Sequence, residues 1–272
     1  MALNNMKTAT ITFHAPNNNG SFLQAYALQK YLTTHFDNIE NDIIDFQPEA
    51  QQQQYAVFRK IHSKKDILRN LISVQHYKAI SKRSASFSEM RKKHLKMTKR
   101  CTSTEEVLEI AEKYDLVIAG SDQIWNTTAR DFSEAFFLPG IPKKATYAVS
   151  CGSHLNEVDC DRICSAMETF ENVSVREIDT REFLEKHTKR SIETVLDPTF
   201  LLTKEDYSGL YDKERILKEK YIFLYTINYD EDALKQTVRV AERLGGCKIV
   251  TPFTGYSAIK AKKYGIKVMW DV

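Results

Sequence analysis

The 272-residue sequence lacks long apolar runs, and no stretch approaches the roughly 18 residues that suggest a membrane span. It also has no apolar stretch behind its first residues that would predict a secretory leader. Cysteine is sparse, with five residues and no Cys/His pairs at the spacing of a zinc finger. These absences predict a cytoplasmic protein in a reducing compartment, with no metal site.

A strong charge of either sign is absent as well, because 39 Lys and Arg face 36 Asp and Glu, a net charge of +3. The exception is residues 58–100, which contain 14 basic and two acidic residues and so carry a net charge of 14 − 2 = +12. The remainder of the chain therefore carries a net charge of 3 − 12 = −9. The segment is either a solvated helical face or a surface for an anionic substrate, such as a phosphorylated or lipid-pyrophosphate compound. No motif that reads nucleic acid accompanies it, and we expect no nucleic-acid partner.

Short β-branched runs alternate with helical patterns, which predicts an α/β fold with parallel strands. Within the first 202 residues the predicted strands cover residues 8–13, 42–46, 116–119, 145–150, 173–176 and 194–196. The predicted domains are an N-terminal domain at 1–202, with a basic helical insertion at about 51–100, and a C-terminal domain at 203–272. Its strands are expected at 221–227, 248–251 and 266–269, and about 70 residues are few for a domain.

Two polar loops follow predicted strands, where parallel sheets bind ligands. The first contains Asn19, Gly20 and Ser21, with Gln24 one helical turn later. Gly20 would let the backbone approach a ligand, and the helix start would offer N–H groups to an anion. The same residues could instead cap the helix and turn the chain.

The second loop reads GSDQIWN, at residues 120–126. Its side chains suit a sugar, because a ring can stack on an indole while carboxylate and amide groups hold hydroxyls. We therefore consider it a second candidate site on the same sheet edge. The candidates are Ser121, Asp122, Gln123, Trp125 and Asn126. The alternative is a helix cap at Ser121 or Asp122 with Trp125 in the core.

Arg176 ends another predicted strand, and its guanidinium could hold a carboxylate or phosphate. The alternative is an ion pair with an acid such as Glu177 or Asp179. His14 and His154 also end strands and are either proton donors or satisfied histidines.

Several stretches together resemble the polysaccharide pyruvyl transferase family, in the order in which the family has them. They are FHAPNNNGSFLQAYALQKYL (13–32), VIAGSDQIWN (117–126), ATYAVSCG (145–152), and SVREIDTREFL (174–184) followed by VLDPTFLL (195–202). The resemblance implies two Rossmann-like domains of glycosyltransferase-B-like architecture with a site in the cleft. It also implies transfer of a pyruvyl group from phosphoenolpyruvate to two hydroxyls of a sugar, which gives a cyclic ketal.

By this resemblance Arg176 would hold phosphoenolpyruvate, Asp122 would serve as acceptor ligand or base, and the first loop would line the cleft. No cofactor is expected besides this donor substrate. The partner would be a saccharide of a capsule, an exopolysaccharide or a precursor. A lipid-linked acceptor and peripheral association with a membrane surface stay open.

The sequence departs from the family in one respect, because it has no Ser-Phe-His-Gly-like motif, whose histidine is the expected acid. The chain thus resembles a C-terminally truncated member. We expect an incomplete second domain with an exposed sheet edge, and little or no transfer by this form alone. The alternatives are a glycosyltransferase that uses a nucleotide-sugar and a noncatalytic saccharide-binding protein.

Overall fold

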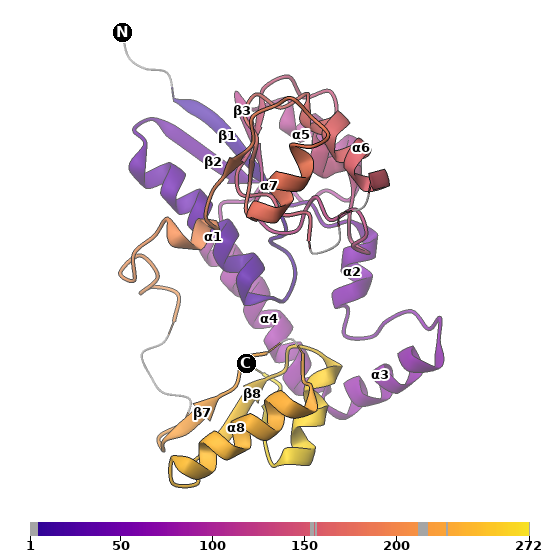
Figure 1. The fold of residues 1–272 in the computed structure, drawn as a ribbon, viewed down its shortest axis with the longest axis vertical. Coiled ribbons are helices and arrows are strands. Elements are labelled where there is room, and N and C mark those ends of the chain that lie inside the picture. Colours follow the sequence, from indigo (N-terminus) through magenta and orange to yellow (C-terminus); the bar gives the residue numbers. More distant parts are fainter. Residues whose placement is uncertain (1–4, 153–154, 156, 212–216, 227, 272) are drawn as a thin grey trace. The chain divides into compact units, whose positions relative to one another are not determined.

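The computed structural model describes residues 5–152, 155, 157–211, 217–226 and 228–271. The described residues form two compact units (Figure 1), of which the first comprises residues up to 55 and 89–208 and the second residues 56–88 and 209–272. Both units are mixed α/β with parallel sheets, as the sequence predicts. The glycosyltransferase-B-like architecture and the domain boundary at 202/203 stay predictions.

A four-stranded parallel sheet in the order β2-β1-β3-β4 forms the centre of the first unit. Its strands are β1 (Met6–Ile11), β2 (Ile39–Ile43), β3 (Leu116–Ala119) and β4 (Lys144–Thr146). The chain runs from β1 to one neighbour, β2, and later places β3 on the other side of β1. Strand order therefore reverses beside β1, and the crevice at the carboxyl ends of β1 and β3 is where such sheets hold ligands.

Two further short strands, β5 (Ser174–Val175) and β6 (Glu193–Thr194), pair with each other. Parallel bridges from Ala145 to Asn172 and from Val149 to Val175 connect this pair to the β4 side of the larger sheet. The end of β5 consequently lies near the chain that follows β3, because Val149 also bridges to Asp122.

Helices cover this sheet, and α1 (Asn19–His35) packs against β2. It begins at Asn19, and the Asn18 side chain caps it by accepting a hydrogen bond from the Gly20 N–H at 2.8 Å. The other helical elements of this unit are α2 (Glu49–Tyr55), α5 (Thr104–Ala111), η1 (Glu134–Phe137), α6 (Glu157–Met167), α7 (Ile178–Leu184) and η2 (Pro198–Phe200).

The second unit contains a three-stranded parallel sheet in the order β7-β8-β9. Its elements are α3 (Lys64–Gln75), β7 (Tyr221–Phe223), α8 (Glu231–Arg243), β8 (Lys248–Pro252), η3 (Tyr256–Tyr264) and β9 (Lys267–Met269). Residues 256–264, where the sequence pattern predicts a helix, form the 3₁₀ helix η3. The helix α4 (Tyr77–His94) runs from residues of the second unit into residues of the first.

Part of the basic segment packs with the C-terminal residues. Ile72, Ala79 and Ile80 contact the apolar cluster that Leu234, Ile249 and their neighbours form. Burial of these side chains is the physical reason why residues 56–88 belong to the second unit. In the described part of the chain, no helix combines the length and apolar character that crossing a membrane requires.

Candidate functional site

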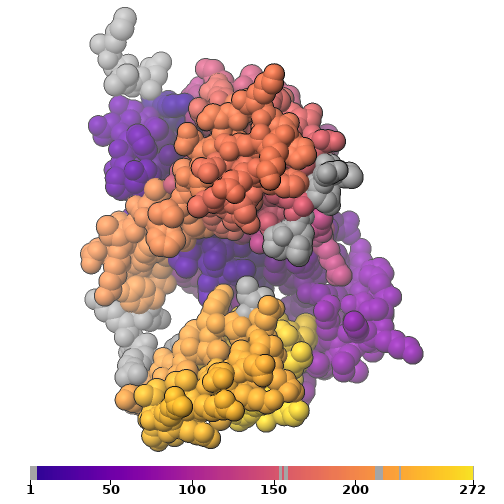
Figure 2. Space-filling model, in the orientation of Figure 1, coloured from indigo at the N-terminus to yellow at the C-terminus, as the bar shows by residue number. Residues whose placement is uncertain are grey.

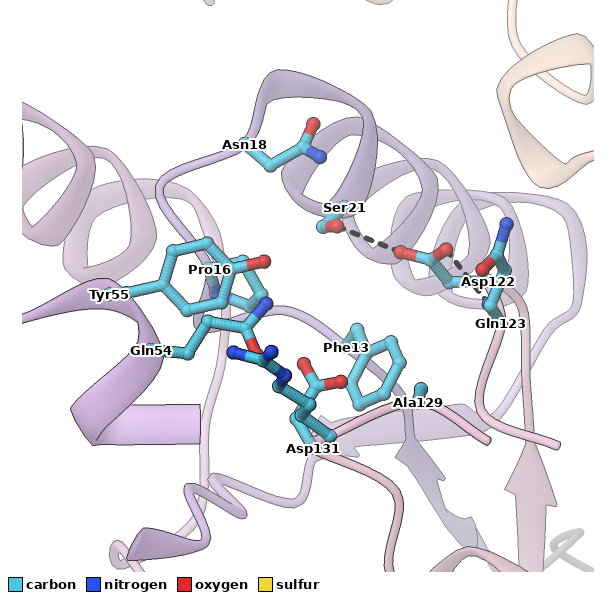
Figure 3. Close-up of a pocket in the computed structure, with 11 residues that line it drawn as sticks. Phe13, Pro16, Asn18, Ser21, Gln54, Tyr55, Asp122, Gln123, Ala129 and Asp131 are labelled. Atoms are coloured by element: carbon cyan, nitrogen blue, oxygen red, sulfur yellow. Dashed lines mark hydrogen bonds between the residues drawn. The ribbon is translucent and has the colours of Figure 1, made fainter. Parts of the chain in front are cut away.

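The two polar loops meet at the carboxyl ends of β1 and β3. The Ser21 hydroxyl, in the first turn of α1, donates a hydrogen bond to the Asp122 carboxylate at 2.8 Å (Figure 3). These residues are 101 positions apart in the sequence, and the reversal of strand order brings them together. The sequence prediction that both loops share one sheet edge agrees with this geometry.

A pocket of about 350 Å³ opens beside this pair. Its walls come from the loops after β1 and β3, from the end of α2 and from residues 129–131. The lining residues are Phe13, Pro16, Asn18, Ser21, Gln54, Tyr55, Asp122, Gln123, Ala129, Arg130 and Asp131. Two carboxylates, amides, hydroxyls and aromatic rings make this lining suitable for a polyhydroxylated ligand.

Gln24 is buried and holds the two loops in place. Its amide nitrogen donates to Thr12 Oγ1 at 3.0 Å and to the carbonyl oxygens of Phe13 and Ser21, both at 2.9 Å. Its amide oxygen accepts from the Ser121 N–H at 3.2 Å. The structure thus gives Gln24 a positioning role, because its polar atoms are used within the protein.

The chain leaves β3 through a tight backbone path at Gly120, whose φ is +134°. A Cβ atom there would lie 2.1 Å from the Tyr147 carbonyl oxygen. Ser121 is fully buried and its hydroxyl donates to the Ala148 carbonyl at 2.7 Å. Ser121 therefore anchors the loop within the protein, and the side chain of the next residue, Asp122, reaches the pocket.

The Asp122 carboxylate has an unusual environment for a charged group. Burial raises its pKa above the ordinary value, while the hydrogen bond from Ser21, the Gln123 N–H and the nearby charge of Arg176 act in the opposite direction. Its backbone φ of 70° lies in the left-handed region, which Asp and Asn tolerate better than most residues. A carboxylate with a raised pKa is suited to accept a proton.

The remaining predicted residues of the second loop separate into two groups. Gln123 is exposed, lines the pocket and accepts a hydrogen bond from Asn126 at 3.2 Å. Trp125 is fully buried and packs on Phe137 and Phe170. Its ring is therefore part of the core, the alternative position considered from the sequence, and offers no face to a sugar in this structure.

The structure places Asn19 and Gly20 at the exposed start of α1, outside the pocket lining. The neighbouring Asn18 lines the pocket and also caps the helix. Asp131 and Tyr55 line it too, and sequence reasoning did not identify them. Asp131 follows the second loop by five residues, whereas Tyr55, at the end of α2, is distant from both loops in sequence and reaches the pocket only in the folded chain.

Arg176 follows β5 and forms ion pairs with two carboxylates. Its Nε donates to Glu177 Oε1 and its Nη1 to Asp197 Oδ2, both at 2.9 Å. Burial would lower the arginine pKa, but the hydrogen bonds and charges of Glu177 and Asp197 raise it overall. The guanidinium remains charged, and Glu177 is one of the partners expected in the alternative from the sequence.

His14 is fully buried, with Nε2 at 3.0 Å from Asp45 Oδ1 and Nδ1 at 3.2 Å from the Thr12 carbonyl. Both ring nitrogens of His14 thus have polar partners inside the protein. This agrees with a structural histidine, the alternative to a proton donor. His154 lies outside the described residues. Within the described ranges, no three or more His, Cys, Asp or Glu side chains are arranged to hold a metal ion.

The chain was compared with protein families, curated proteins and solved structures. A search of curated proteins gave no match. Among solved structures, the chain is similar to a UDP-GlcNAc 2-epimerase from Neisseria meningitidis bound to UDP-GlcNAc. The two sequences are 13% identical, and the superposition covers 97% of this chain and 71% of that chain with a TM-score of 0.45. The model of the polysaccharide pyruvyl transferase family matches residues 18–258, which include both loops, Arg176 and most of the second unit. The chain therefore belongs to the polysaccharide pyruvyl transferase family.

Proposed function

We propose that this protein is a transferase that moves the pyruvyl group of phosphoenolpyruvate to two hydroxyls of one sugar in a cell-surface polysaccharide or its precursor. The observation that carries the proposal is the Ser21–Asp122 pair, which faces a polar pocket at the carboxyl ends of β1 and β3 in a chain of this family. We place the reaction in the cytoplasm, where cells make phosphoenolpyruvate.

The reaction sets requirements that the site can be compared with. The methylene carbon of phosphoenolpyruvate gains a proton, its central carbon forms bonds to two sugar oxygens, and the bond to the phosphate oxygen breaks. Two hydroxyl protons are released, and inorganic phosphate leaves. The protein must therefore supply a proton donor for the methylene carbon, a proton acceptor near the sugar and cations near the phosphoenolpyruvate.

Asp122 is our candidate for the proton acceptor or acceptor ligand. Its carboxylate lines the pocket, its orientation is set by Ser21, and its pKa is raised by burial. Asp131 lines the same pocket, is buried, and has one oxygen 3.5 Å from the Gln51 amide nitrogen. Two carboxylates in one pocket suit a sugar that presents two hydroxyls.

Arg176 is our candidate for holding the donor. Its bonds to Glu177 and Asp197 use two of the five N–H groups of a guanidinium, and the others can donate to a carboxylate or phosphate. Its charge also acts on Asp122, so the donor and acceptor positions of the proposal are electrostatically connected.

Calorimetric titration of the purified protein tests the ligand class. We expect phosphoenolpyruvate to bind and UDP-GlcNAc not to bind. Binding of UDP-sugars without phosphoenolpyruvate would contradict pyruvyl transfer and favour a nucleotide-sugar-dependent glycosyltransferase. Binding of glycans that is the same in Arg176→Ala, without any binding of phosphoenolpyruvate, would favour a noncatalytic saccharide-binding protein.

A further inference from the structure

The helix α3 exposes an apolar stripe to solvent. Ile67, Leu68, Leu71 and Val74 have exposed fractions of 46%, 60%, 63% and 63%. Positions i, i+1, i+4 and i+7 lie on one side of an α-helix, so these four side chains form a continuous strip. The purple segment that contains α3 lies at the surface in the space-filling view (Figure 2).

The opposite face of α3 fixes the helix to the second unit. Ile72 contacts the apolar cluster there, Ser73 Oγ lies 2.7 Å from the Tyr256 hydroxyl, and the Asn70 side chain bonds both the N–H and the carbonyl of Arg59. The Ser63 side chain caps the first turn by accepting from the Asp66 N–H. The helix thus has a packed face, and the exposed strip is an additional feature that the fold does not use.

Apolar exposure is concentrated in this part of the chain. Of the 18 large apolar side chains that are exposed among the described residues, seven lie within residues 58–77. They are Phe58, Ile61, Ile67, Leu68, Leu71, Val74 and Tyr77. Contiguous apolar exposure of this kind marks an interaction surface more often than single exposed residues do.

The charge around the strip determines the kind of partner. Residues 56–88 hold eight Lys and Arg and one acidic residue, so their balance is 8 − 1 = +7. Lys64, Lys65 and Lys78 are exposed, and no ion pair involves them within the described residues. An apolar strip flanked by lysines fits the surface of an anionic bilayer, where apolar side chains enter the headgroup region and lysines meet lipid phosphates.

We propose that the α3 face (Lys64, Lys65, Ile67, Leu68, Leu71, Val74 and Lys78) binds the surface of membranes that contain anionic lipids. Binding involves one face of α3 together with Lys78 in the first turn of α4, and no membrane crossing. The proposal does not depend on the pyruvyl transfer reaction, because it rests on residues outside the pocket.

Flotation with lipid vesicles tests the proposal. We expect the protein to float with vesicles of phosphatidylglycerol and phosphatidylcholine, and not with phosphatidylcholine alone. The double variant Leu68→Ser/Leu71→Ser removes apolar contact, and Lys64→Gln/Lys65→Gln removes charge. Each should reduce binding to the anionic vesicles about tenfold or more, and added salt should have the same effect as the Lys variant.

A matched control comes from the end of α8, where Val240 and the C-cap residue Leu244 are also exposed but the helix carries equal numbers of basic and acidic residues. Val240→Ser/Leu244→Ser should leave binding unchanged, and circular dichroism should show the wild-type melting curve for all variants. Absence of wild-type binding, or equal binding by the Leu68/Leu71 variant, would overturn the proposal. So would a dimer in solution that this variant dissociates without any vesicle binding, because the strip would then contact a second copy.

Discussion

Asp122 combines features that individually cost stability. Its carboxylate has a pKa raised by burial, and its backbone has a positive φ. A carboxyl group whose pKa is raised on folding destabilises the folded state when it is charged. A fold keeps such a residue when its chemistry is used, which is why we attach the acceptor role to Asp122.

The substitution Asp122→Asn tests this reasoning. Asn tolerates the same φ and keeps an acceptor for Ser21, but it has no charge to desolvate. Below the ordinary pKa of 3.8 the aspartate is neutral in both states, and its unfavourable contribution develops as the pH rises through the folded-state pKa. We therefore expect the variant to gain stability relative to wild type as the pH rises from acidic to neutral.

Urea unfolding at several pH values measures this difference. Asp161→Asn, which replaces an exposed carboxylate on α6, serves as the control for removal of a carboxylate. A stability difference between wild type and Asp122→Asn that is independent of pH, or that shifts toward wild type at neutral pH, would contradict the account.

The residue types of the two loops predicted the location of the site better than they predicted what each residue does in it. The polar composition of GSDQIWN indicated a ligand site, and Asp122 and Gln123 do line the pocket. The loop has no helical or strand period, so nothing in the sequence showed that Trp125 points into the core. Asn18, the residue that caps α1, lines the pocket, whereas Asn19 is the first residue of the helix and lies outside the lining.

At the level of elements, the exit from β3 determines where Asp122 lies. Replacement of Gly120 by Ala would place a Cβ 2.1 Å from a backbone oxygen and require a φ that L-residues rarely adopt. We expect Gly120→Ala to lower the free energy of unfolding by more than about 3 kcal/mol. Gly140 has a φ of +80° and no atom within 4 Å of the place that a Cβ would occupy, so Gly140→Ala should cost only about 1 kcal/mol.

Chemical denaturation of the two glycine variants gives this comparison directly. Equal losses of stability would show that the close approach of the Tyr147 carbonyl does not restrict residue 120.

The strand β4 begins with Lys144, a buried lysine whose ammonium donates to the carbonyls of Phe137 and Leu138. Burial lowers the pKa of Lys144 to about 8, compared with 10.5 for an ordinary lysine side chain. Between these pH values the folded protein has released a proton that the unfolded chain still holds, so stability from this group rises with pH. Over that window we expect the unfolding free energy of wild type to increase by about 3 kcal/mol relative to Lys144→Met.

Unfolding of both proteins at pH 8 and above measures this shift. Lys7→Met, which replaces an exposed lysine on β1, serves as the control for removal of a lysine. A constant difference between wild type and Lys144→Met would show that the ammonium is not desolvated as the structure indicates.

The sequence predicted most strands because a strand of a parallel sheet is covered on both faces, and short runs of β-branched apolar residues are typical of such strands. It also predicted a helix over residues 256–264, and the structure has a helix there, of the 3₁₀ type. Nine residues separate periods of 3.0 and 3.6 poorly. The packing of Ile72 and Ile80 on the C-terminal cluster was not predictable, because an apolar face does not specify its long-range partner.

At the scale of the whole molecule, the family match and the site support each other. The family assignment covers residues 18–258, and the two loops that carried the resemblance meet in the structure. The charge asymmetry adds a separate property, since the basic residues 56–88 pack with the C-terminal residues, whereas both loops and Arg176 belong to the first unit. Ligand binding and surface binding can therefore be tested by different substitutions.

The central claim is that Arg176 holds an anionic donor at a site that Asp122 shares. Calorimetric titration of phosphoenolpyruvate into wild type, Arg176→Ala and Arg176→Lys tests it most directly. We predict that Arg176→Ala weakens binding at least about 30-fold and that Lys restores little of it, since a bidentate contact to carboxylate or phosphate requires the guanidinium. Asp122→Asn should bind the donor at least as tightly as wild type, because it removes a negative charge. Equal affinity of wild type and Arg176→Ala for phosphoenolpyruvate, or no binding by wild type, would contradict the account.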